Sequence, residues 1–202
     1  MNAVATSPLA INRAYYEAHA DEFIKRTAEI ALDDLYQPFL SRLPEHAQIL
    51  DAGCGTGRDG AIFQAAGYRV TAIDASPAMV HAARSRGLQA RVLTFQRMKF
   101  ASEFDGIWAC ASLLHVPHKE IPNVLDRFAS ALKPNGILYV SLKEGSGERV
   151  AKDGRFFSYF RQDEFAELLT EGRRFTLLKS WPTHAADSSG KDWPWLNFLA
   201  QR

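Results

Sequence analysis

The feature that most constrains this chain is a run of glycines at alternate positions, directly after a short apolar segment. In the stretch Ile49-Leu50-Asp51-Ala52-Gly53-Cys54-Gly55-Thr56-Gly57, the apolar residues end in a carboxylate and the glycines follow. Glycine lets the backbone approach a bound ligand closely, where any Cβ would collide. Residues 48–52 predict a buried strand and residues 59–66 a helix. A strand, a glycine turn and a helix in succession are typical of nucleotide-binding α/β domains.

The spacing of the glycines separates two classes of cofactor. The dinucleotide fingerprint G-x-G-x-x-G places its third glycine three positions after the second, whereas Gly57 follows Gly55 by only two. The G-K-[ST] ending of a phosphate-binding P-loop is also missing here. The pattern Asp-x-Gly-x-Gly-x-Gly resembles motif I of the class I S-adenosylmethionine (SAM) methyltransferases, including small bacterial enzymes of the tellurite-resistance-like and quinone-biosynthesis-like kinds. The alternative is a generic glycine turn in an α/β fold.

The length and the net charge of the chain limit the number of domains and the kinds of partner to be expected. A chain of 202 residues suits one domain with a sizeable core. Its net charge of +1 gives no general attraction to nucleic acid or to an anionic membrane. Neither Cys54 nor Cys110 has zinc-ligand spacing, so no metal is expected. No secretory signal or membrane span is evident, and we expect a cytoplasmic protein; the oligomeric state is not readable from the sequence.

Strand and helix patterns alternate along the chain. Strands are expected at 48–52, 68–73, 90–94, 106–111, 137–142, 176–181 and 195–199, and helices at 59–66, 77–87, 117–132 and 163–170. Residues 11–43 predict two or three further helices, interrupted at Pro38 and Pro44. This order predicts an α/β fold with a mainly parallel sheet covered by helices on both faces.

The resemblance refines this expectation. It implies a Rossmann-like sheet of seven strands, closed by an antiparallel hairpin, with an N-terminal helical lid. Residues 1–202 would form a single class I methyltransferase domain. Within it, residues 1–44 would be the lid, 45–145 the SAM-binding core, and 146–202 the acceptor-pocket segment and C-terminal hairpin.

SAM is the cofactor that the resemblance implies. The residues expected to contact it are Asp51, Gly53, Cys54, Gly55, Thr56, Gly57, Asp74, Ala75, Met79, Phe95, Gln96, Ala109, Tyr16 and Thr27. Asp74 ends the second strand, where a carboxylate can accept both ribose hydroxyls, as motif II does in the family. Its alternative role is a helix cap, although Ser76 fits that role better. Asp51 faces either the methionine amine or the turn itself.

The adenine end departs from the family pattern. The family usually places an acidic residue after the third strand, whereas this chain has Phe95 and Gln96 there. Phe95 could stack on the adenine and the Gln96 carbonyl could accept from its amine, or both could be ordinary loop residues. Ala75 and Met79 would flank the adenine, with the core as an alternative place for Met79. The small Ala109 would allow the reacting methyl to pass close to the fourth strand.

The N-terminal helices resemble the lid of small methyltransferases. Tyr16 is the aromatic expected to close over SAM, and Thr27 or Arg26 could reach its carboxylate. The alternative is an amphipathic helix that only packs on the sheet.

The acceptor site is expected after the fourth and fifth strands. His115 is a candidate general base because histidine titrates near neutrality, or else a histidine packed in its loop. Arg155 and Tyr159 lie in a segment that interleaves arginine with aromatic residues, which suits a planar or anionic acceptor. Alternatively, this segment is an aromatic plug in which Arg155 pairs with an acidic neighbour such as Asp153. No obligatory catalytic triad is expected, because SAM already carries an activated methyl group.

These observations predict a SAM-dependent methyltransferase that transfers a methyl group to a small-molecule acceptor by in-line displacement. Two alternatives remain within SAM chemistry: a non-catalytic regulatory protein that binds SAM or S-adenosylhomocysteine, and an RNA methyltransferase. The glycine spacing disfavours a third, an NAD-dependent oxidoreductase.

Overall fold

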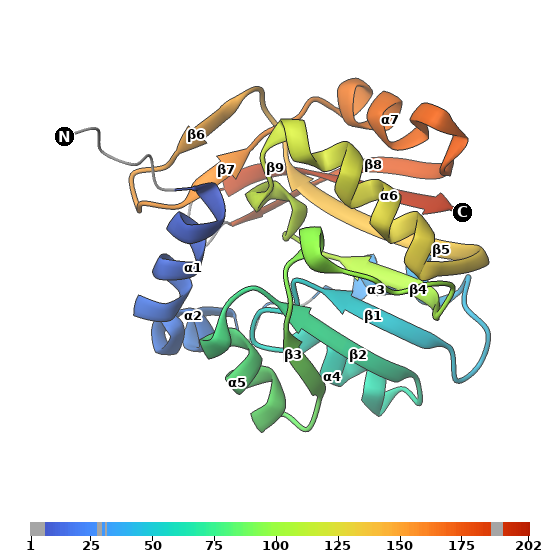
Figure 1. Cartoon of the computed structure of the whole chain (residues 1–202), viewed down its shortest axis with the longest axis horizontal. Helices are drawn as coiled ribbons and strands as arrows, with labels where there is room; N and C mark the ends of the chain where they lie inside the picture. The colour runs from blue at the N-terminus through green and yellow to red at the C-terminus, as the bar shows by residue number, and fades with distance from the viewer. Residues whose placement is uncertain (1–6, 28–29, 31, 187–191) are drawn as a thin grey trace.

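The computed structural model describes residues 7–27, 30, 32–186 and 192–202, and a seven-stranded sheet forms its centre (Figure 1). Strands β3, β2, β1, β4 and β5 are parallel in that order, and β9 and β8 continue the sheet in antiparallel fashion. The bounds are β1 Gln48–Ala52, β2 Arg69–Asp74, β3 Gln89–Val92, β4 Phe104–Ala109, β5 Leu132–Lys143, β8 Thr176–Ala186 and β9 Asp192–Gln201. The expected Rossmann-like sheet with a closing hairpin is confirmed.

Helices cover both faces of this sheet. Those on one face are α3 (Asp33–Leu40), α4 (Arg58–Ala65) and α5 (Pro77–Ser85), and those on the other are α6 (Ile121–Ala131) and α7 (Gln162–Thr170). Because successive strand residues point to opposite faces, β4 contributes to both cores. Trp108 packs among the first set of helices, where its ring stacks on Tyr139 at 3.9 Å, and Ile107 packs among the second.

The site is positioned by the point at which the strand order reverses. Strand β1 lies between β2 and β4, and in open α/β sheets ligands bind beyond the carboxyl ends of the strands at such a point. Helices α1 (Pro8–Ala18) and α2 (Ala20–Thr27) lie at this end of the sheet, at the left of Figure 1. They occupy the place expected for the lid. Residues 1–6 of the lid segment lie outside the described residues.

Several element bounds differ from expectation, and further differences concern α3, β5 and the segment after β5. Pro38 lies inside α3 instead of interrupting it. The proline removes only one backbone hydrogen bond, and burial of Tyr36 and Phe39 in the core outweighs that loss. Strand β5 begins at Leu132, where it pairs with Phe104 before an irregularity in register. A small separate sheet of β6 (Glu148–Val150) and β7 (Phe156–Ser158) was not expected, because its strands are too short to give a periodic pattern.

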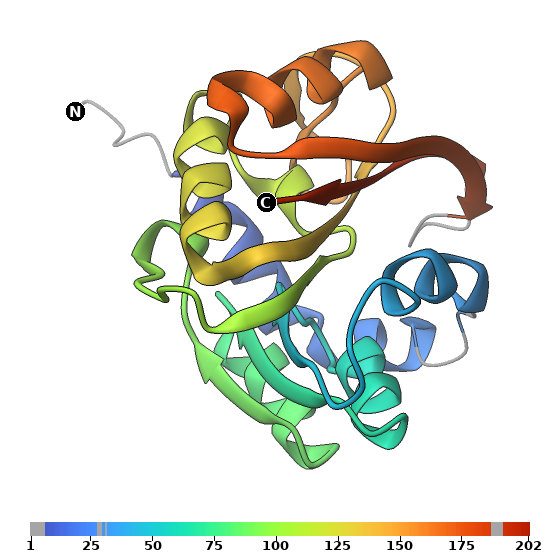
Figure 2. The same cartoon turned by 90° about the vertical axis from the view of Figure 1, so that its right-hand side faces the viewer.

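The hairpin β8–β9 curves over one end of the sheet, as Figure 2 shows. Strand β9 pairs with β5 on one side and with β8 on the other. Within the described ranges, no helix has the length and apolarity needed to cross a membrane.

Candidate functional site

A cavity of about 990 Å³ lies beyond the carboxyl ends of the parallel strands. This volume is near the upper end of the roughly 300–1,000 Å³ range of small-molecule sites. Its walls come from the glycine turn, the loops after β2, β3 and β4, helices α1 and α2, and strands β5, β8 and β9. The predicted site residues that line it are Tyr16, Thr27, Asp51, Gly53, Cys54, Gly55, Thr56, Asp74, Ala75, Met79, Phe95, Gln96, His115 and Arg155.

The glycine turn presents bare backbone to this cavity. Gly53 and Gly55 have φ values of +80° and +51°, in the left-handed region that favours glycine. The N–H groups of Gly53 and Cys54 both donate to the Ile73 carbonyl at 2.8 and 2.9 Å, which anchors the turn to β2. A Cβ on Gly55 would meet nothing closer than the Phe23 ring at 3.7 Å. A Cβ there would therefore fill space that is open to a ligand.

Three predicted site residues lie behind the cavity wall instead of lining it: Gly57, Ala109 and Tyr159. A Cβ on Gly57 would come within 2.8 Å of the Ala83 Cα, so this glycine permits close packing of α4 on α5. Ala109 is fully buried in the core at the end of β4. Tyr159 is also buried, because its ring is covered by the guanidinium of Arg149, which lies 4.1 Å from the ring centre.

Asp74 joins two strand ends. Its Oδ2 accepts from the Gly55 N–H at 3.0 Å and its Oδ1 from the Ser76 N–H at 2.8 Å. Burial raises the pKa of Asp74, and these N–H groups oppose that rise. The Ser76 hydroxyl caps α5 by accepting from the Met79 N–H at 3.3 Å, as predicted. Asp74 is therefore not needed as the helix cap, and its carboxylate lines the cavity beside the turn.

Asp51 has a local role at the same turn. Its Oδ2 accepts from the Gly60 N–H in the first turn of α4 at 3.2 Å. Burial, and then the nearby charge of Asp59, raise the pKa of Asp51. Asp59 is itself held by Arg58 at 2.6 Å and by the Trp108 indole at 2.8 Å.

The segment after β3 forms another wall. The Phe95 ring packs edge-on against Phe128 with centres 5.5 Å apart. The Gln96 amide nitrogen donates to Glu120 at 2.8 Å, which leaves its carbonyl oxygen as an acceptor toward the cavity. Met79 is 1% exposed and also lines the cavity, so it is a core residue, and the contact with adenine stays a prediction.

The lid is bonded to the rest of the site by α1 side chains. The Tyr16 hydroxyl lies 2.8 Å from Nε2 of His115. The Asn12 amide exchanges two hydrogen bonds with the backbone of Phe156, at 2.8 and 3.0 Å. Glu17 accepts from the Ser76 hydroxyl at 2.6 Å, next to Asp74. These contacts hold α1 against both β7 and α5.

His115 is held as a neutral base. Its Nδ1 lies 2.9 Å from the Phe156 carbonyl, which only accepts; these partners assign the proton to Nδ1 and leave Nε2 to accept from Tyr16. Burial, together with the nearby charges of Arg155 and Lys143, lowers the pKa of His115 to about 4, and the hydrogen bond to the Phe156 carbonyl opposes this shift. The imidazole is thus unprotonated at neutral pH.

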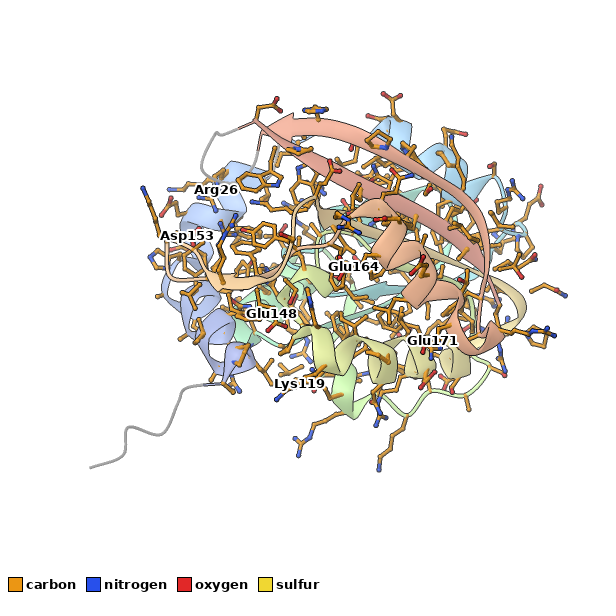
Figure 3. All side chains as sticks on the ribbon, turned by 90° about the horizontal axis from the view of Figure 1, so that it is seen from above. Arg26, Lys119, Glu148, Asp153, Glu164 and Glu171 are labelled. Carbon is orange, nitrogen blue, oxygen red and sulfur yellow. The ribbon has the colours of Figure 1, made fainter. Side chains whose placement is uncertain are left out.

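Two of the arginine side chains that line the cavity are Arg155 and Arg26. Arg155 is buried, pairs with Asp153 at 2.5 Å and lies over the Phe157 ring at 4.9 Å. The pairing with Asp153 was one of the two alternatives, and Arg155 lines the cavity as well. Arg26, at the same end of the molecule as Asp153 in Figure 3, also lines the cavity. The hydroxyl of Thr27 donates to the Phe23 carbonyl within α2 at 2.8 Å.

Several lining residues were missed by the sequence reasoning. They are Ser112, Ser141, Lys143, Thr183, Trp195 and Asn197. Lys143 ends a strongly apolar strand, and the rule that ligands lie beyond carboxyl strand ends could have identified it. Ser112 follows β4 and Ser141 lies within β5, whereas Trp195 and Asn197 lie on β9, and Thr183 lies on the part of β8 beyond the predicted strand at 176–181.

Unsatisfied polar atoms gather at this cavity. Among the described residues, the buried side-chain nitrogen and oxygen atoms without a hydrogen-bond partner are Arg26 Nε, Ser112 Oγ and Trp195 Nε1. All three residues line the cavity. Buried polar groups are normally paired, so this clustering fits a polar ligand. The open cradle at Gly55 and the Asp74 carboxylate fit a nucleoside with an amino-acid tail.

The fold and this site define a Rossmann-like SAM-binding protein, and comparison with known proteins agrees. Residues 49–136 match the family described as "Methyltransferase domain". The chain is 34% identical over 103 residues to the ubiquinone biosynthesis O-methyltransferase of Xylella fastidiosa strain 9a5c. The aligned region covers 47% of this chain and 41% of that protein. The chain thus matches less than half the length of this curated relative.

Solved structures share the fold over a longer span. The 1,6-didemethyltoxoflavin-N1-methyltransferase of Burkholderia thailandensis, crystallised with 1,6-didemethyltoxoflavin and S-adenosylhomocysteine, has a TM-score of 0.78 at 26% identity, covering 100% of this chain and 93% of that one. A SAM-dependent methyltransferase of Methanosarcina mazei has a TM-score of 0.77 at 22% identity, covering 86% and 99%. These matches support the class I SAM-dependent methyltransferase superfamily, in which SAM is the cofactor.

Proposed function

We propose that this chain transfers the methyl group of SAM to a small-molecule acceptor bound in the same cavity, and that residues 1–202 act together as one methyltransferase domain. The observation that carries this proposal is that one cavity is lined by two chemically different sets of groups. One set is the bare backbone of the glycine turn with the Asp74 carboxylate, and the other consists of rings, cations and the neutral His115.

At the cofactor end, each group has a place in recognising SAM. The turn at Gly55 would receive the methionine part against bare main chain, and Asp74 would accept from the ribose hydroxyls. Gln96 offers a carbonyl oxygen to the adenine amine. The guanidinium of Arg26 suits the methionine carboxylate, since its Nε is buried without a partner in the described structure.

The chain itself contributes to the chemistry by positioning the acceptor and by excluding water from the cavity. SAM, when bound, supplies an activated methyl group on a sulfonium. The protein must hold the nucleophile in line with that methyl, and such positioning supplies up to about 7–11 kcal/mol in favourable cases. Helix α1, bonded to β7 and α5, shields the cavity from solvent at its lid side.

A base is available for an acceptor that must lose a proton. The Tyr16 hydroxyl donates to Nε2 of His115, so the Tyr16 oxygen can accept the proton of an acceptor hydroxyl as its own proton passes to His115. The acceptor oxygen gains the methyl group, and its proton leaves through Tyr16 and His115 to solvent, because the low pKa of His115 prevents it from keeping the proton at neutral pH. The relatives include proteins named as an O-methyltransferase and an N1-methyltransferase. A hydroxyl oxygen and a ring nitrogen are therefore the first acceptor atoms to test.

The deciding experiment supplies purified protein with methyl-labelled SAM, a small-molecule extract and, separately, an RNA fraction. Mass spectrometry then finds which molecules acquire the label. A labelled small molecule, absent with Asp74→Ala, supports the proposal. Label on RNA alone would replace it with an RNA methyltransferase. SAM binding without any labelled product would favour the regulatory alternative.

A further inference from the structure

A row of three side chains crosses the antiparallel part of the sheet at the cavity. Strand β9 places Trp195 directly opposite Lys143 of β5 and opposite Thr183 of β8. Directly paired residues point to the same face of a sheet, and all three line the cavity. None of them is part of the turn, the ribose carboxylate or the base described above, although the charge of Lys143 acts on the pKa of His115.

Besides the Lys143 ammonium, the other two members of this row offer hydrogen-bond donors. The Trp195 indole nitrogen is buried, without an acceptor in the part of the chain that the structure describes, and an indole N–H can only donate. The Thr183 hydroxyl oxygen accepts from the Asn197 amide at 3.0 Å, which directs its own hydrogen elsewhere.

The amide of Asn197 is fixed by its neighbours. Its oxygen accepts from the Tyr139 hydroxyl at 2.7 Å, and its nitrogen donates to the Trp181 carbonyl at 3.1 Å as well as to Thr183. Because these partners set the orientation of the amide, Thr183 must act as the acceptor in that pair. The hydroxyl hydrogen of Thr183, which lines the cavity, is therefore left for another acceptor.

The Phe157 ring lies between the base His115 and Lys143, a member of the row. The Phe157 ring is 4.9 Å from the His115 ring and 4.9 Å from the Lys143 ammonium. The same ammonium lies 5.7 Å from the Trp195 ring. Phe157 and Trp195 thus both lie against the Lys143 ammonium, and with His115 they give this part of the cavity wall an aromatic lining, which favours a flat ligand.

We infer that Trp195 and Thr183 form the recognition edge of the acceptor site and select flat aromatic molecules that carry an oxygen hydrogen-bond acceptor. The inference rests on the proposed function and adds the substrate class to it. An acceptor without such an oxygen would leave the buried indole N–H unpaired, which costs binding free energy. A flexible amine has neither the flat shape nor the oxygen.

The test uses protein saturated with S-adenosylhomocysteine and labelled with ¹⁵N at the indoles of its 4 tryptophans. The probe is 3,4-dihydroxybenzoate at millimolar concentration, and spermidine is the opposing probe. We expect the Trp195 indole N–H resonance, assigned with Trp195→Phe, to move downfield with 3,4-dihydroxybenzoate and not with spermidine. The Trp181 resonance, assigned with Trp181→Phe, should stay in place because Trp181 lies outside the cavity wall.

Affinities give the second readout. Trp195→Phe keeps an aromatic ring and removes the donor, and Thr183→Val keeps the shape and removes the hydroxyl. Each should weaken the binding of 3,4-dihydroxybenzoate about tenfold, the effect of one hydrogen bond, with the affinity for S-adenosylhomocysteine unchanged. An unmoved Trp195 resonance, undiminished affinity in both variants, or a response to spermidine would overturn the inference. Failure of the wild-type protein to bind S-adenosylhomocysteine would instead overturn the proposed function.

Discussion

The Oδ2 atom of Asp74 accepts a hydrogen bond from the backbone N–H of Gly55 at 3.0 Å, and this bond ties the end of β2 to the turn after β1. The carboxylate proposed to bind the ribose and the backbone proposed to receive the methionine part therefore belong to one rigid unit. Loss of the carboxylate should affect both contacts.

Asp74→Ala is expected to weaken SAM binding at least tenfold, measured by calorimetry. Hydrogen bonds to a charged group contribute about 1.5–3 kcal/mol each, so one lost ribose contact is enough for that effect. Asp105→Ala is the matched control, because Asp105 pairs with Lys133 away from the cavity and carries the same charge. Equal affinity of wild type and Asp74→Ala would remove the ribose assignment.

Substitution by alanine should have different effects at two glycines of the same turn, Gly55 and Gly57. Both have positive φ, so each alanine carries about 1–2 kcal/mol of backbone strain. In Gly55→Ala the new methyl enters the open cradle, and SAM binding should be lost while the fold is kept. In Gly57→Ala the methyl meets the Ala83 Cα at 2.8 Å, and the melting temperature should fall further. Binding retained by Gly55→Ala would contradict the close approach of ligand and backbone.

The sequence predicted the parallel part of the fold well because local and tertiary preferences agree there. The strand, glycine turn and helix around Gly55 and the Ser76 cap lie where expected. Pro38 was misjudged because core packing of Tyr36 and Phe39 overrides a local preference. The β6–β7 sheet was missed because three-residue strands carry no periodicity.

The sequence predicted the site residues that belong to recognisable motifs. Asp74 and Gly55 follow from their positions at strand ends, and both line the cavity. Gly57 belongs to the same motif as Gly55 but allows close packing against α5 instead of lining the cavity. This difference depends on the position of Ala83, which the sequence does not give. Trp195 and Thr183 were beyond prediction because their shared place depends on register between strands far apart in the chain.

His115 should make stability depend on pH in the acid range. Its pKa is about 4 in the folded protein, against about 6.5 in an unfolded chain. Between these values the unfolded chain binds more protons, so the stabilisation from His115 is complete above about pH 6.5 and is lost as the pH falls toward 4. A shift of this size corresponds to on the order of 3 kcal/mol.

Urea unfolding at about pH 7 and pH 5 checks this dependence. His115→Gln keeps an amide that can bond to Tyr16 and does not titrate, so its loss of stability on acidification should be smaller than that of wild type. The comparison between the two proteins cancels the carboxylates that titrate in the same range. Identical pH slopes would show that the imidazole is not held neutral by burial.

Tyr16→Phe tests the proton relay. The variant keeps the ring that packs on Phe23 and His115 and removes the hydroxyl that lies 2.8 Å from Nε2. General acid–base groups contribute roughly 10²–10⁴-fold to rate, so kcat for a hydroxyl acceptor should fall at least tenfold, while the Kd for SAM stays within about twofold. Tyr15→Phe is the matched control, because the Tyr15 ring packs on His19 instead of His115. A loss of SAM affinity with kcat preserved would make Tyr16 a cofactor-covering residue, the role that the family resemblance alone suggests.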